Sequence, residues 1–432
     1  MSKAFKIAIA GLGTVGAGTV KLIQSNLELL RRRSGHDIEI VAVSARSKKD
    51  RGVDLSSMQW FDDAVEMART VDADLVMELI GGSEGIARDV VETALGRGLH
   101  VITANKALLA HHGASLARLA EEKGVSLAYE AAVAGGIPII KGLREGLAAN
   151  GVSNVYGILN GTCNYILTNM KETGRDFEEV LKEAQDLGYA EAEPSTDVDG
   201  FDASHKLALL SSLAFGVEVD FDNVYIEGIR NVSSTDIAAA TDLGYKIKLL
   251  GITKMVDGKL SQRVHPCMVE EDAAIGQVDG VLNAVVCNGG DLGYAFFEGP
   301  GAGAGPTASA VVADLVDILR GLRLPVFGIP SSDLNKAENQ EIVERFGAYY
   351  LRLTVRDQPG VIADVTAILR DHSISVRSMI QRNSNPGKNV SVIITTHDVA
   401  ERDMRKAIDA INALEANAEP VNMIRIANVQ MI

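Results

Sequence analysis

The chain has 432 residues, of which 47% are hydrophobic and 5% aromatic, and its formal net charge is −15. A length of this size predicts roughly two to four domains, and the apolar content excludes a disordered chain. The acidic excess argues against nucleic acid or an anionic membrane as the main partner. Cys163, Cys267 and Cys287 are too few and too scattered for a disulfide framework or a thiolate metal site, which favours a reducing cytoplasm.

Strands and helices alternate across the first 131 residues. Short apolar segments typical of strands lie at 6–10, 38–43, 74–79, 101–104 and 126–131. Helical periodicity covers 14–33, 84–97 and 107–123. This alternation predicts an α/β, doubly wound parallel sheet of the Rossmann type, with helices on both faces.

The middle of the chain, 132–301, has a mixed α+β pattern. Its expected strands are 152–159 and 295–298, and its expected helices are 161–172, 177–187 and 203–215. A glycine-rich loop at 299–309 precedes an apolar helix at 310–321. Glycine at such a loop lets backbone approach a ligand closely.

Residues 331–346 are polar and charged and are expected to form a linker. After them, strand patterns lie at 349–355, 374–381, 389–396 and 420–427, with helical patterns at 361–372 and 401–414. The order β-α-β-β-α-β predicts a ferredoxin-like domain over 347–432.

A glycine-rich turn follows the first strand and opens the first helix. It consists of Gly11, Leu12, Gly13, Thr14, Val15 and Gly16. The spacing is the dinucleotide fingerprint: the first glycine allows the turn, the second admits the pyrophosphate and the third permits close helix packing. A structural turn without a ligand is the alternative.

The end of the second strand distinguishes between nicotinamide cofactors. An NAD enzyme usually has an acid there, whereas this chain has no carboxylate before Asp50. Arg46 and Lys48 could instead pair with a 2′-phosphate, which favours NADP. A solvated basic loop and the use of both cofactors remain open.

Two further segments contain candidate catalytic side chains. Lys106 follows the strand at 101–104, at the edge of the sheet that faces the ligand crevice, although a surface charge that begins a helix is also possible. Asp202 and Lys206 are four residues apart on one helical face. They could form a surface ion pair, or a carboxylate could orient a lysine that moves a proton to or from a substrate hydroxyl.

Two other functions are compatible with parts of the sequence. Cys163, at a helix start, could be the nucleophile of an acylating aldehyde dehydrogenase, but no histidine lies close in sequence. Alternatively, a dinucleotide-binding sensor could have lost its activity and act through its C-terminal module; the intact acidic and lysine-containing cluster at 191–206 argues against this.

Several long motifs, and the order in which they occur, resemble those of the homoserine dehydrogenase family. They are GLGTVG, TANKALL at 103–109, YEAAVAGGIPII at 129–140, ILNGTCNYIL at 158–167, GYAEAEPSTDVDGFDASHK at 188–206 and GPGAGAGPTASAVVADL at 299–315. The C-terminal part resembles an ACT domain. The resemblance implies a nucleotide-binding domain of residues 1–131 completed by 302–325, and a catalytic and dimerisation domain of residues 132–301.

The resemblance also implies an activity and the residues that perform it. The family interconverts L-homoserine and L-aspartate 4-semialdehyde with NAD(P). Its catalytic lysine falls on Lys206, a second lysine on Lys106, and active-site acids on Asp197 and Asp202, with the substrate-binding glutamate on Glu191. Carbonyl oxygens would hold a sodium ion, and Gly303 would meet the cofactor. The implied sodium positions are Glu130, Val133, Gly135 and Ile137.

The ACT resemblance implies regulation. Asp357, Gly360 and Val361 match the ligand loop, where amides at a helix N-terminus can receive an amino-acid carboxylate. L-Threonine, the end product of the pathway, is the expected effector; a dimerisation module without a ligand is the alternative. We therefore expect a homodimer or homotetramer that serves threonine and methionine biosynthesis.

Overall fold

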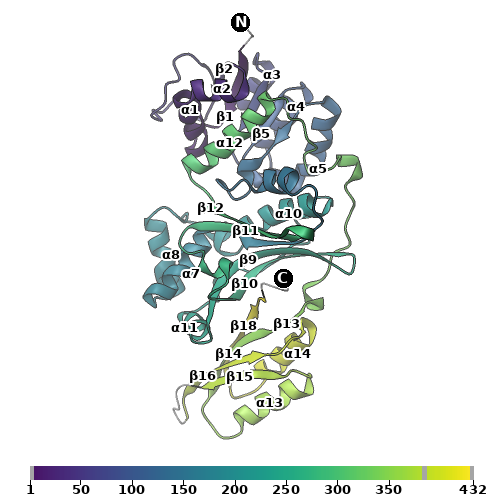
Figure 1. The fold of residues 1–432 in the computed structure, drawn as a ribbon. Helices are drawn as coiled ribbons and strands as arrows, with labels where there is room; N and C mark the ends of the chain where they lie inside the picture. Colours follow the sequence, from purple (N-terminus) through teal and green to yellow (C-terminus); the bar gives the residue numbers. More distant parts are fainter. Residues whose placement is uncertain (1–3, 382–386, 429–432) are drawn as a thin grey trace.

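The computed structural model describes residues 4–381 and 387–428 and shows three layers of structure along one axis (Figure 1). The first is a six-stranded parallel sheet in the order β3-β2-β1-β4-β5-β6. This order confirms the predicted doubly wound sheet. The strands are β1 (Phe5–Ala10), β2 (Ile38–Ser44), β3 (Gln59–Phe61), β4 (Leu75–Glu78), β5 (His100–Thr103) and β6 (Leu127–Ala128).

The helices of this layer are α1 (Thr14–Ser25), α2 (Leu27–Ser34), α3 (Ala64–Thr70), α4 (Ile86–Gly96) and α5 (Lys106–Lys123). The expected single helix at 14–33 is in fact two helices separated at Asn26. The Asn26 amide donates to the Leu22 carbonyl at 3.0 Å, a local bond that competes with helix continuation. Strand β3 and helix α3 were not predicted, because each is too short for a periodic signal.

Helix α12 (Ala304–Leu319) returns from late in the chain and packs against α1, beside β1 and β5 (Figure 1). It begins at Ala304 rather than at the expected residue 310, so the glycine-rich loop is shorter than predicted. Gly303 takes the left-handed φ of 116° that ends the loop. Pro306 lies in the first helical turn, where the missing amide has no helical partner to lose.

The second layer is a mixed sheet with helices on one face. Its strands are β7 (Val152–Ile158), β8 (Tyr225–Ile226), β9 (Tyr245–Val256), β10 (Lys259–Glu270), β11 (Leu282–Gly289) and β12 (Gly293–Pro300). Its helices are α6 (Ile139–Lys141), α7 (Gly161–Thr173), α8 (Phe177–Asp186), α9 (Ser195–Val198), α10 (Phe201–Phe215) and α11 (Ser234–Asp242). Short turns complete it: η1 (Glu130–Ala132), η2 (Gly142–Gly146), η3 (Ala274–Gln277) and η4 (Gly290–Leu292). The β9–β10 hairpin and β11 were not predicted, because they are buried strands without clear alternation.

The third layer is the predicted ferredoxin-like domain, with strand order β18-β14-β16-β15. Its elements are β14 (Tyr349–Arg356), α13 (Val361–Asp371), β15 (Val376–Gln381), β16 (Asn389–Thr396), α14 (Glu401–Asn412) and β18 (Asn417–Ile426), with a small pair β13 (Phe346–Gly347) and β17 (Val399–Ala400). Before it, the expected linker contains η5 (Ser331–Asp333) and η6 (Ile342–Glu344) and bridges to Val217 and Leu260.

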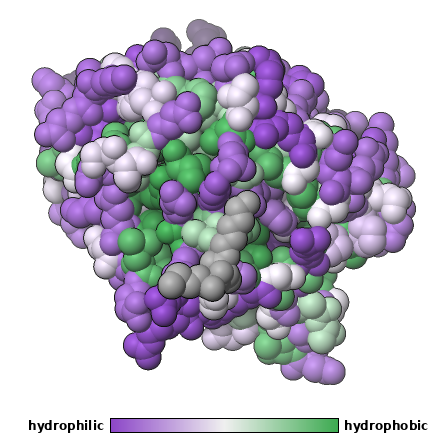
Figure 2. Space-filling view, turned by 90° about the horizontal axis from the view of Figure 1, so that it is seen from above, coloured by the Kyte–Doolittle hydropathy of each residue, from purple (hydrophilic) through white to green (hydrophobic). Residues whose placement is uncertain are grey.

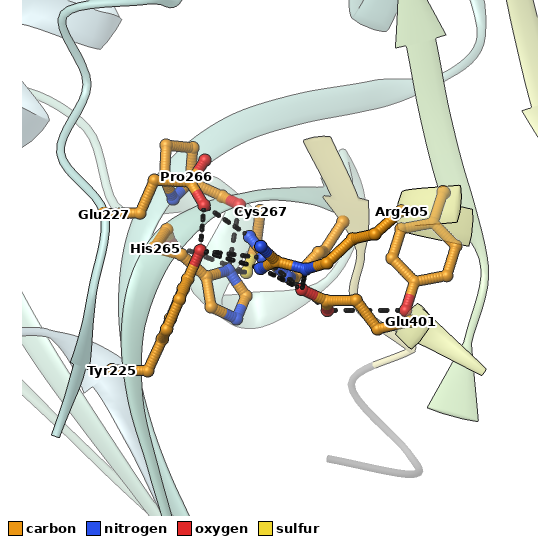
Figure 3. A network of polar contacts seen from close by, with 9 residues as sticks. Tyr225, Glu227, His265, Pro266, Cys267, Glu401 and Arg405 are labelled. Atoms are coloured by element: carbon orange, nitrogen blue, oxygen red, sulfur yellow. Dashed lines mark hydrogen bonds and ion pairs between the residues drawn. The ribbon is translucent and has the colours of Figure 1, made fainter. Parts of the chain in front are cut away.

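The second and third layers share one continuous sheet, because β18 pairs in parallel with β10. Buried ionic groups reinforce this junction (Figure 3). The fully buried Arg425 of β18 donates to Glu401 at 2.7 Å and to Glu227 at 2.8 Å. Arg405 donates to the same Glu401 at 2.6 Å and to Tyr225 at 3.2 Å.

The end of the molecule opposite to this junction carries mainly hydrophilic side chains around a more apolar centre (Figure 2). Strand β1 starts near this end and runs toward the second layer (Figure 1). The carboxyl ends of the parallel strands therefore face the rest of the molecule. No helix among the described residues is long and apolar enough to cross a membrane.

Candidate active site

The glycine turn after β1 has the geometry expected of a pyrophosphate cradle. Gly11 has a φ of 98°, and a Cβ there would lie 2.5 Å from the Leu79 carbonyl oxygen. A Cβ on Gly16 would lie 1.9 Å from the Gly11 oxygen, so only glycine lets α1 pack this closely. A Cβ on Gly13 would meet nothing within 4 Å.

The start of α1 therefore opens onto free space. Its N-cap, Gly13, provides no side-chain bond to the first amides of the helix, which leaves them available for an anion. A Cβ on Gly18 would lie 2.8 Å from the carbonyl oxygen of Ala304, so the start of α12, with Gly303 before it, lies directly beside α1. These residues fit a dinucleotide.

The basic loop after β2 lies exposed at the same edge of the sheet. Arg46 and Lys48 are exposed, and the Lys48 ammonium lies 5.4 Å from the centre of the Trp60 ring. Arg51, which sequence reasoning did not single out, donates to the carbonyl oxygens of Leu12 at 2.7 Å and Ser47 at 2.7 Å. It thereby ties the basic loop to the glycine turn.

Lys106 begins α5 at the carboxyl end of β5, where Asn105 caps the helix by accepting from the Leu108 amide at 3.0 Å. The Asn105 amide also donates to the Gly82 carbonyl at 2.7 Å. Glu78, fully buried at the end of β4, accepts from the Thr103 hydroxyl at 2.6 Å. These bonds join the loops after β4 and β5 into one rigid edge.

Lys106, Asp202 and Lys206 meet in one ionic cluster. The Lys206 ammonium donates to Asp202 Oδ2 at 2.7 Å and to the Leu159 carbonyl at 2.6 Å. The Lys106 ammonium lies 2.9 Å from Asp202 Oδ1. Asp202 and Lys206 are 5% and 7% exposed, so the alternative of a surface ion pair is wrong.

Asp197 joins this cluster through Asn160, the N-cap of α7. The Asn160 amide donates to Asp197 at 2.7 Å and to Asp202 at 2.9 Å, and its oxygen accepts from the Cys163 amide at 2.8 Å. One side chain thus caps a helix and bridges two carboxylates. Asn160 has no predicted role in the sequence analysis, although an asparagine directly before a helix start is a capping signal.

The charges of the cluster shift the pKa values in opposite directions. Burial lowers the pKa of Lys206; Asp202 opposes this shift and Lys106 adds to it. The carboxylate of Asp202 raises the pKa of Lys106. Burial acts to raise the pKa of Asp202, but the Lys206 and Lys106 ammonium groups outweigh it and hold that pKa well below its usual range.

The segment before α10 contains two further acidic side chains, Asp199 and Glu191. Asp199 does not cap α10; the N-cap is Gly200, and Asp199 pairs with Arg230 at 2.6 Å. Gly200 has a φ of 92°, a left-handed conformation that glycine adopts readily and that turns the chain into α10. The Glu191 side chain is exposed and makes no hydrogen bond or ion pair within the described part of the chain, so the structure does not bring it into contact with Lys206.

The turn at 130–137 offers buried carbonyl oxygens. Val133 is fully buried and Gly135 is buried, and no donor in the described ranges reaches either carbonyl oxygen. The Glu130 oxygen receives only a 3.4 Å bond from the Val133 amide, and the Ile137 oxygen receives a 2.8 Å bond from the Ile139 amide. Buried oxygens without donors fit a hard monovalent cation. The described residues contain no cluster of three or more His, Cys, Asp or Glu side chains that could hold a metal ion.

Cys163 does not have the environment of a nucleophile. It is fully buried, and its thiol lies 3.2 Å from the Asp197 carbonyl oxygen, to which it donates. Burial, and then the nearby Asp197 carboxylate, raise the pKa of the thiol well above its usual value. The alternative of an acylating enzyme therefore has no support in this site.

The expected ligand loop of the C-terminal domain lies away from this cluster, in the third layer. Gly360, with a φ of 95°, is the N-cap of α13 and offers no side chain to the helix amides. Val361 is buried, and the Asp357 amide donates to the Lys388 carbonyl at 2.8 Å. The start of α13 is therefore exposed at Gly360 and anchored at Val361.

A parallel sheet with a glycine turn at its carboxyl edge, next to a buried lysine–carboxylate cluster, defines a nicotinamide-dependent oxidoreductase. Sequence models of three families match the chain: "Homoserine dehydrogenase, NAD binding domain" at residues 11–130, "Homoserine dehydrogenase" at 138–316 and "ACT domain" at 349–416. The chain belongs to the homoserine dehydrogenase family.

Relatives support the same assignment along the whole chain. The homoserine dehydrogenase of Pseudomonas aeruginosa is 44% identical, with 98% of this chain and 99% of that protein covered. That of Neisseria gonorrhoeae is 42% identical, with 99% of each covered. The crystal structure of a homoserine dehydrogenase from Thiobacillus denitrificans is 42% identical with a TM-score of 0.93 and covers 99% of each chain. A hyperthermophilic archaeal homoserine dehydrogenase solved in complex with NADPH is 26% identical, with a TM-score of 0.64 over 74% of this chain and 99% of that one.

Proposed function

We propose that this chain interconverts L-homoserine and L-aspartate 4-semialdehyde at the cluster of Lys106, Asp202 and Lys206. One observation carries the proposal: Lys206 is a buried lysine with a lowered pKa, held by Asp202 at the carboxyl edge of a dinucleotide-binding sheet. A bound nicotinamide cofactor supplies the hydride acceptor or donor. The chain itself supplies the proton transfer.

In the oxidation direction, neutral Lys206 accepts the proton of the substrate hydroxyl while hydride leaves the carbon that bears this hydroxyl. Asp202 accepts from Lys206 at 2.7 Å and so orients the amine. Lys106, whose pKa is raised, stays protonated and donates to the substrate oxygen. The carboxylates of Glu191 and Asp197 bind the substrate ammonium; the exposed Glu191 carboxylate is not committed to another partner among the residues described.

NADP is the proposed cofactor, with NAD as a weaker alternative. The support is the exposed pair Arg46 and Lys48 on a loop that Arg51 ties to the glycine turn. Guanidinium and ammonium groups pair well with a 2′-phosphate. The archaeal homoserine dehydrogenase solved in complex with NADPH is consistent with this preference.

A sodium ion at Glu130, Val133, Gly135 and Ile137 is proposed as a second bound group, through carbonyl oxygens. The support is the pair of donorless carbonyls in this turn. A Cβ on Gly135 would lie 2.5 Å from the Gly301 carbonyl oxygen, so the turn touches the loop that precedes α12. An ion there would stiffen the junction between the catalytic layer and the nucleotide-binding layer.

Regulation by L-threonine through Asp357, Gly360 and Val361 is proposed for the ACT domain, in a homodimer or homotetramer that serves threonine and methionine synthesis. The proposed division of the chain is 1–131 with 302–325 for the cofactor, 132–301 for catalysis and dimerisation, 331–346 as linker and 347–432 for regulation. The exposed start of α13 supports the effector site.

The proposed reaction is tested by following nicotinamide absorbance with L-homoserine and either NADP or NAD. Wild type should reduce the cofactor, and Lys206→Ala should lower kcat by about 10²–10⁴-fold. Folded wild-type protein that reduces neither cofactor would overturn the proposal and favour the binding-only alternative.

The threonine proposal needs the full chain, because removing the ACT domain would expose the β10 edge to which β18 pairs. Asp357→Ala and Gly360→Val should weaken inhibition by L-threonine, and Gln358→Ala, an exposed neighbour, is the matched control. Equal inhibition in all three variants would refute this ligand loop.

A further inference from the structure

A polar cavity lies between the catalytic sheet and the ACT domain, away from the lysine cluster. Its volume is about 600 Å³, within the range of small-molecule sites. Side chains from β10, from the linker and from the ACT domain line it, including Arg263, His265, Arg345, Arg377 and His397. Nothing in the proposed reaction uses them.

Arg263, at the inner wall, is a buried cation without a carboxylate. It is 6% exposed, and its guanidinium donates to the Ser261 hydroxyl at 2.9 Å. Its Nε has no hydrogen-bond partner, and no ion pair reaches it within the described ranges. Burial, with Arg345 and Arg425 nearby, lowers the pKa of Arg263 to about 10. A buried charge without a counter-ion is strongly unfavourable.

The surrounding acids do not compensate Arg263. Glu401, a buried carboxylate of the junction, already accepts from Arg425 and Arg405 (Figure 3). The other arginines of the wall, Arg345 and Arg377, also form no ion pair with a carboxylate among the described residues. Arg345 donates through Nη2 to the Ile426 carbonyl at 3.2 Å, but its buried Nη1 has no partner. The acids that line the cavity are all exposed at its rim: Asp257, Glu270, Glu344 and Asp398.

His265 is a buried hydrogen-bond acceptor in the wall of the cavity, so a ligand there also needs a donor group. It is 1% exposed, and its Nδ1 lies 3.0 Å from the Pro266 carbonyl oxygen. A carbonyl only accepts, so this contact favours a proton on Nδ1, from which the Cys267 sulfur at 3.2 Å can also accept. In this tautomer Nε2 is an acceptor. Nε2 is buried and has no partner. Three nitrogens of the residues that line the cavity therefore lack a partner: the donors Arg263 Nε and Arg345 Nη1, and the acceptor His265 Nε2.

We propose that this cavity binds a small carboxylate that also carries a hydrogen-bond donor, namely a hydroxy- or amino-carboxylic acid. The carboxylate accepts from Arg263 and Arg345, since a guanidinium matches two carboxylate oxygens. The hydroxyl or ammonium of the ligand donates to His265 Nε2. Because the walls come from both β10 and the ACT domain, the ligand stabilises the junction between them.

The test uses the full chain, with glycolate and acetate as probes and chloride at equal ionic strength as the reference. Glycolate should raise the melting temperature more than acetate does, because only glycolate carries a hydroxyl for His265. Arg263→Met should weaken glycolate binding by about 10–100-fold in calorimetry. The same variant should melt higher than wild type without ligand, since it removes an uncompensated buried charge.

Two further variants keep the test decisive. Arg345→Gln covers the case in which Arg263→Met does not fold, and His265→Phe should bring the glycolate response down to that of acetate. Arg356→Gln, an exposed arginine of β14 that does not line the cavity, is the matched control and should respond as wild type.

Three outcomes would overturn the proposal. The first is that glycolate binds equally to wild type, Arg263→Met and Arg345→Gln, which would place its site elsewhere, for example in the active site. The second is that neither glycolate nor acetate binds to the wild-type chain. The third is that Arg263→Met changes the oligomeric mass measured by light scattering while glycolate leaves the melting temperature of wild type unchanged. This result would assign the cavity to a contact between copies of the chain.

Discussion

Lys106 and Lys206 come from different layers of the molecule, yet each binds its own oxygen of the Asp202 carboxylate, at 2.9 Å and 2.7 Å. Lys106 begins α5 of the nucleotide-binding layer, whereas Asp202 and Lys206 lie one turn apart on α10. The carboxylate thus fixes the cofactor side of the site relative to the proton-transferring side. The ionisation of each lysine depends on the other two groups.

The pH profile provides a test of this coupling. Homoserine oxidation requires neutral Lys206, so kcat/KM should rise as pH passes the pKa of Lys206. Asp202 raises that pKa, so Asp202→Asn should move the rising limb to lower pH. Lys106 lowers it, so Lys106→Met should move the limb to higher pH. Normalised profiles that shift in the same direction in both variants would refute the assignment of Lys206.

Asn160 should show separable effects of helix capping and carboxylate bridging. Asn160→Ser keeps a cap for α7 but cannot reach both Asp197 and Asp202, so the melting temperature should stay near wild type while kcat falls about 10-fold or more. Asn160→Ala removes both, and should also lower the free energy of unfolding by about 0.5–2 kcal/mol. Chemical unfolding and steady-state rates on the same samples measure the two effects. Unchanged rates in Asn160→Ser would show that the bridge is only structural.

The sequence predicted the parts of the site that depend on local spacing. The glycine turn, the Asp202–Lys206 pair and the start of α5 at Lys106 each follow from neighbours within a few residues. Asn160 and Arg51 were missed because their partners are distant: Asn160 meets Asp202 across 42 positions, and Arg51 meets Leu12 across 39. Such long-range partners leave no periodic or spacing signal in a single sequence.

For the fold too, the sequence predicted the local elements but not the long-range pairing. The βαβ alternation and the ferredoxin-like order were visible in the sequence, since each element has its own amphipathic period. The continuous sheet of β10 and β18 was not, because the residues paired there, Cys267 and Arg425, are far apart in sequence. Buried strands such as β9 show no alternation and therefore resemble core helices in sequence.

Cofactor selectivity should depend on the basic loop. Arg46→Ala and Lys48→Ala should each lower kcat/KM for NADP by about 10–100-fold, because each removes a charge-assisted bond to the 2′-phosphate, and should leave NAD nearly unchanged. Lys49→Ala, an exposed lysine of the same loop, is the matched control. Parallel losses with both cofactors would indicate that the loop acts on the shared part of the dinucleotide. Arg51→Met should impair both, since Arg51 holds the glycine turn through Leu12.

The junction between the catalytic layer and the ACT domain should be sensitive to Glu401. Arg425 is fully buried, and Glu401→Gln leaves its guanidinium without a charged acceptor at that position. The free energy of unfolding should therefore fall by about 3–5 kcal/mol, and the melting temperature should fall with it. The double variant Glu401→Gln with Arg425→Met removes both charges and should recover much of this loss.

The same pair has a defined pH dependence. Burial acts to raise the pKa of Glu401, but hydrogen bonds and charge from Arg425 outweigh it and lower that pKa below its usual value. The contribution of Glu401 is therefore present above its unfolded pKa of about 4.3 and is lost as pH falls through its lower folded pKa. The difference in melting temperature between wild type and Glu401→Gln should be constant near neutral pH and shrink in acid. A difference that instead grew in acid would contradict the assignment of this pair as an ionised contact.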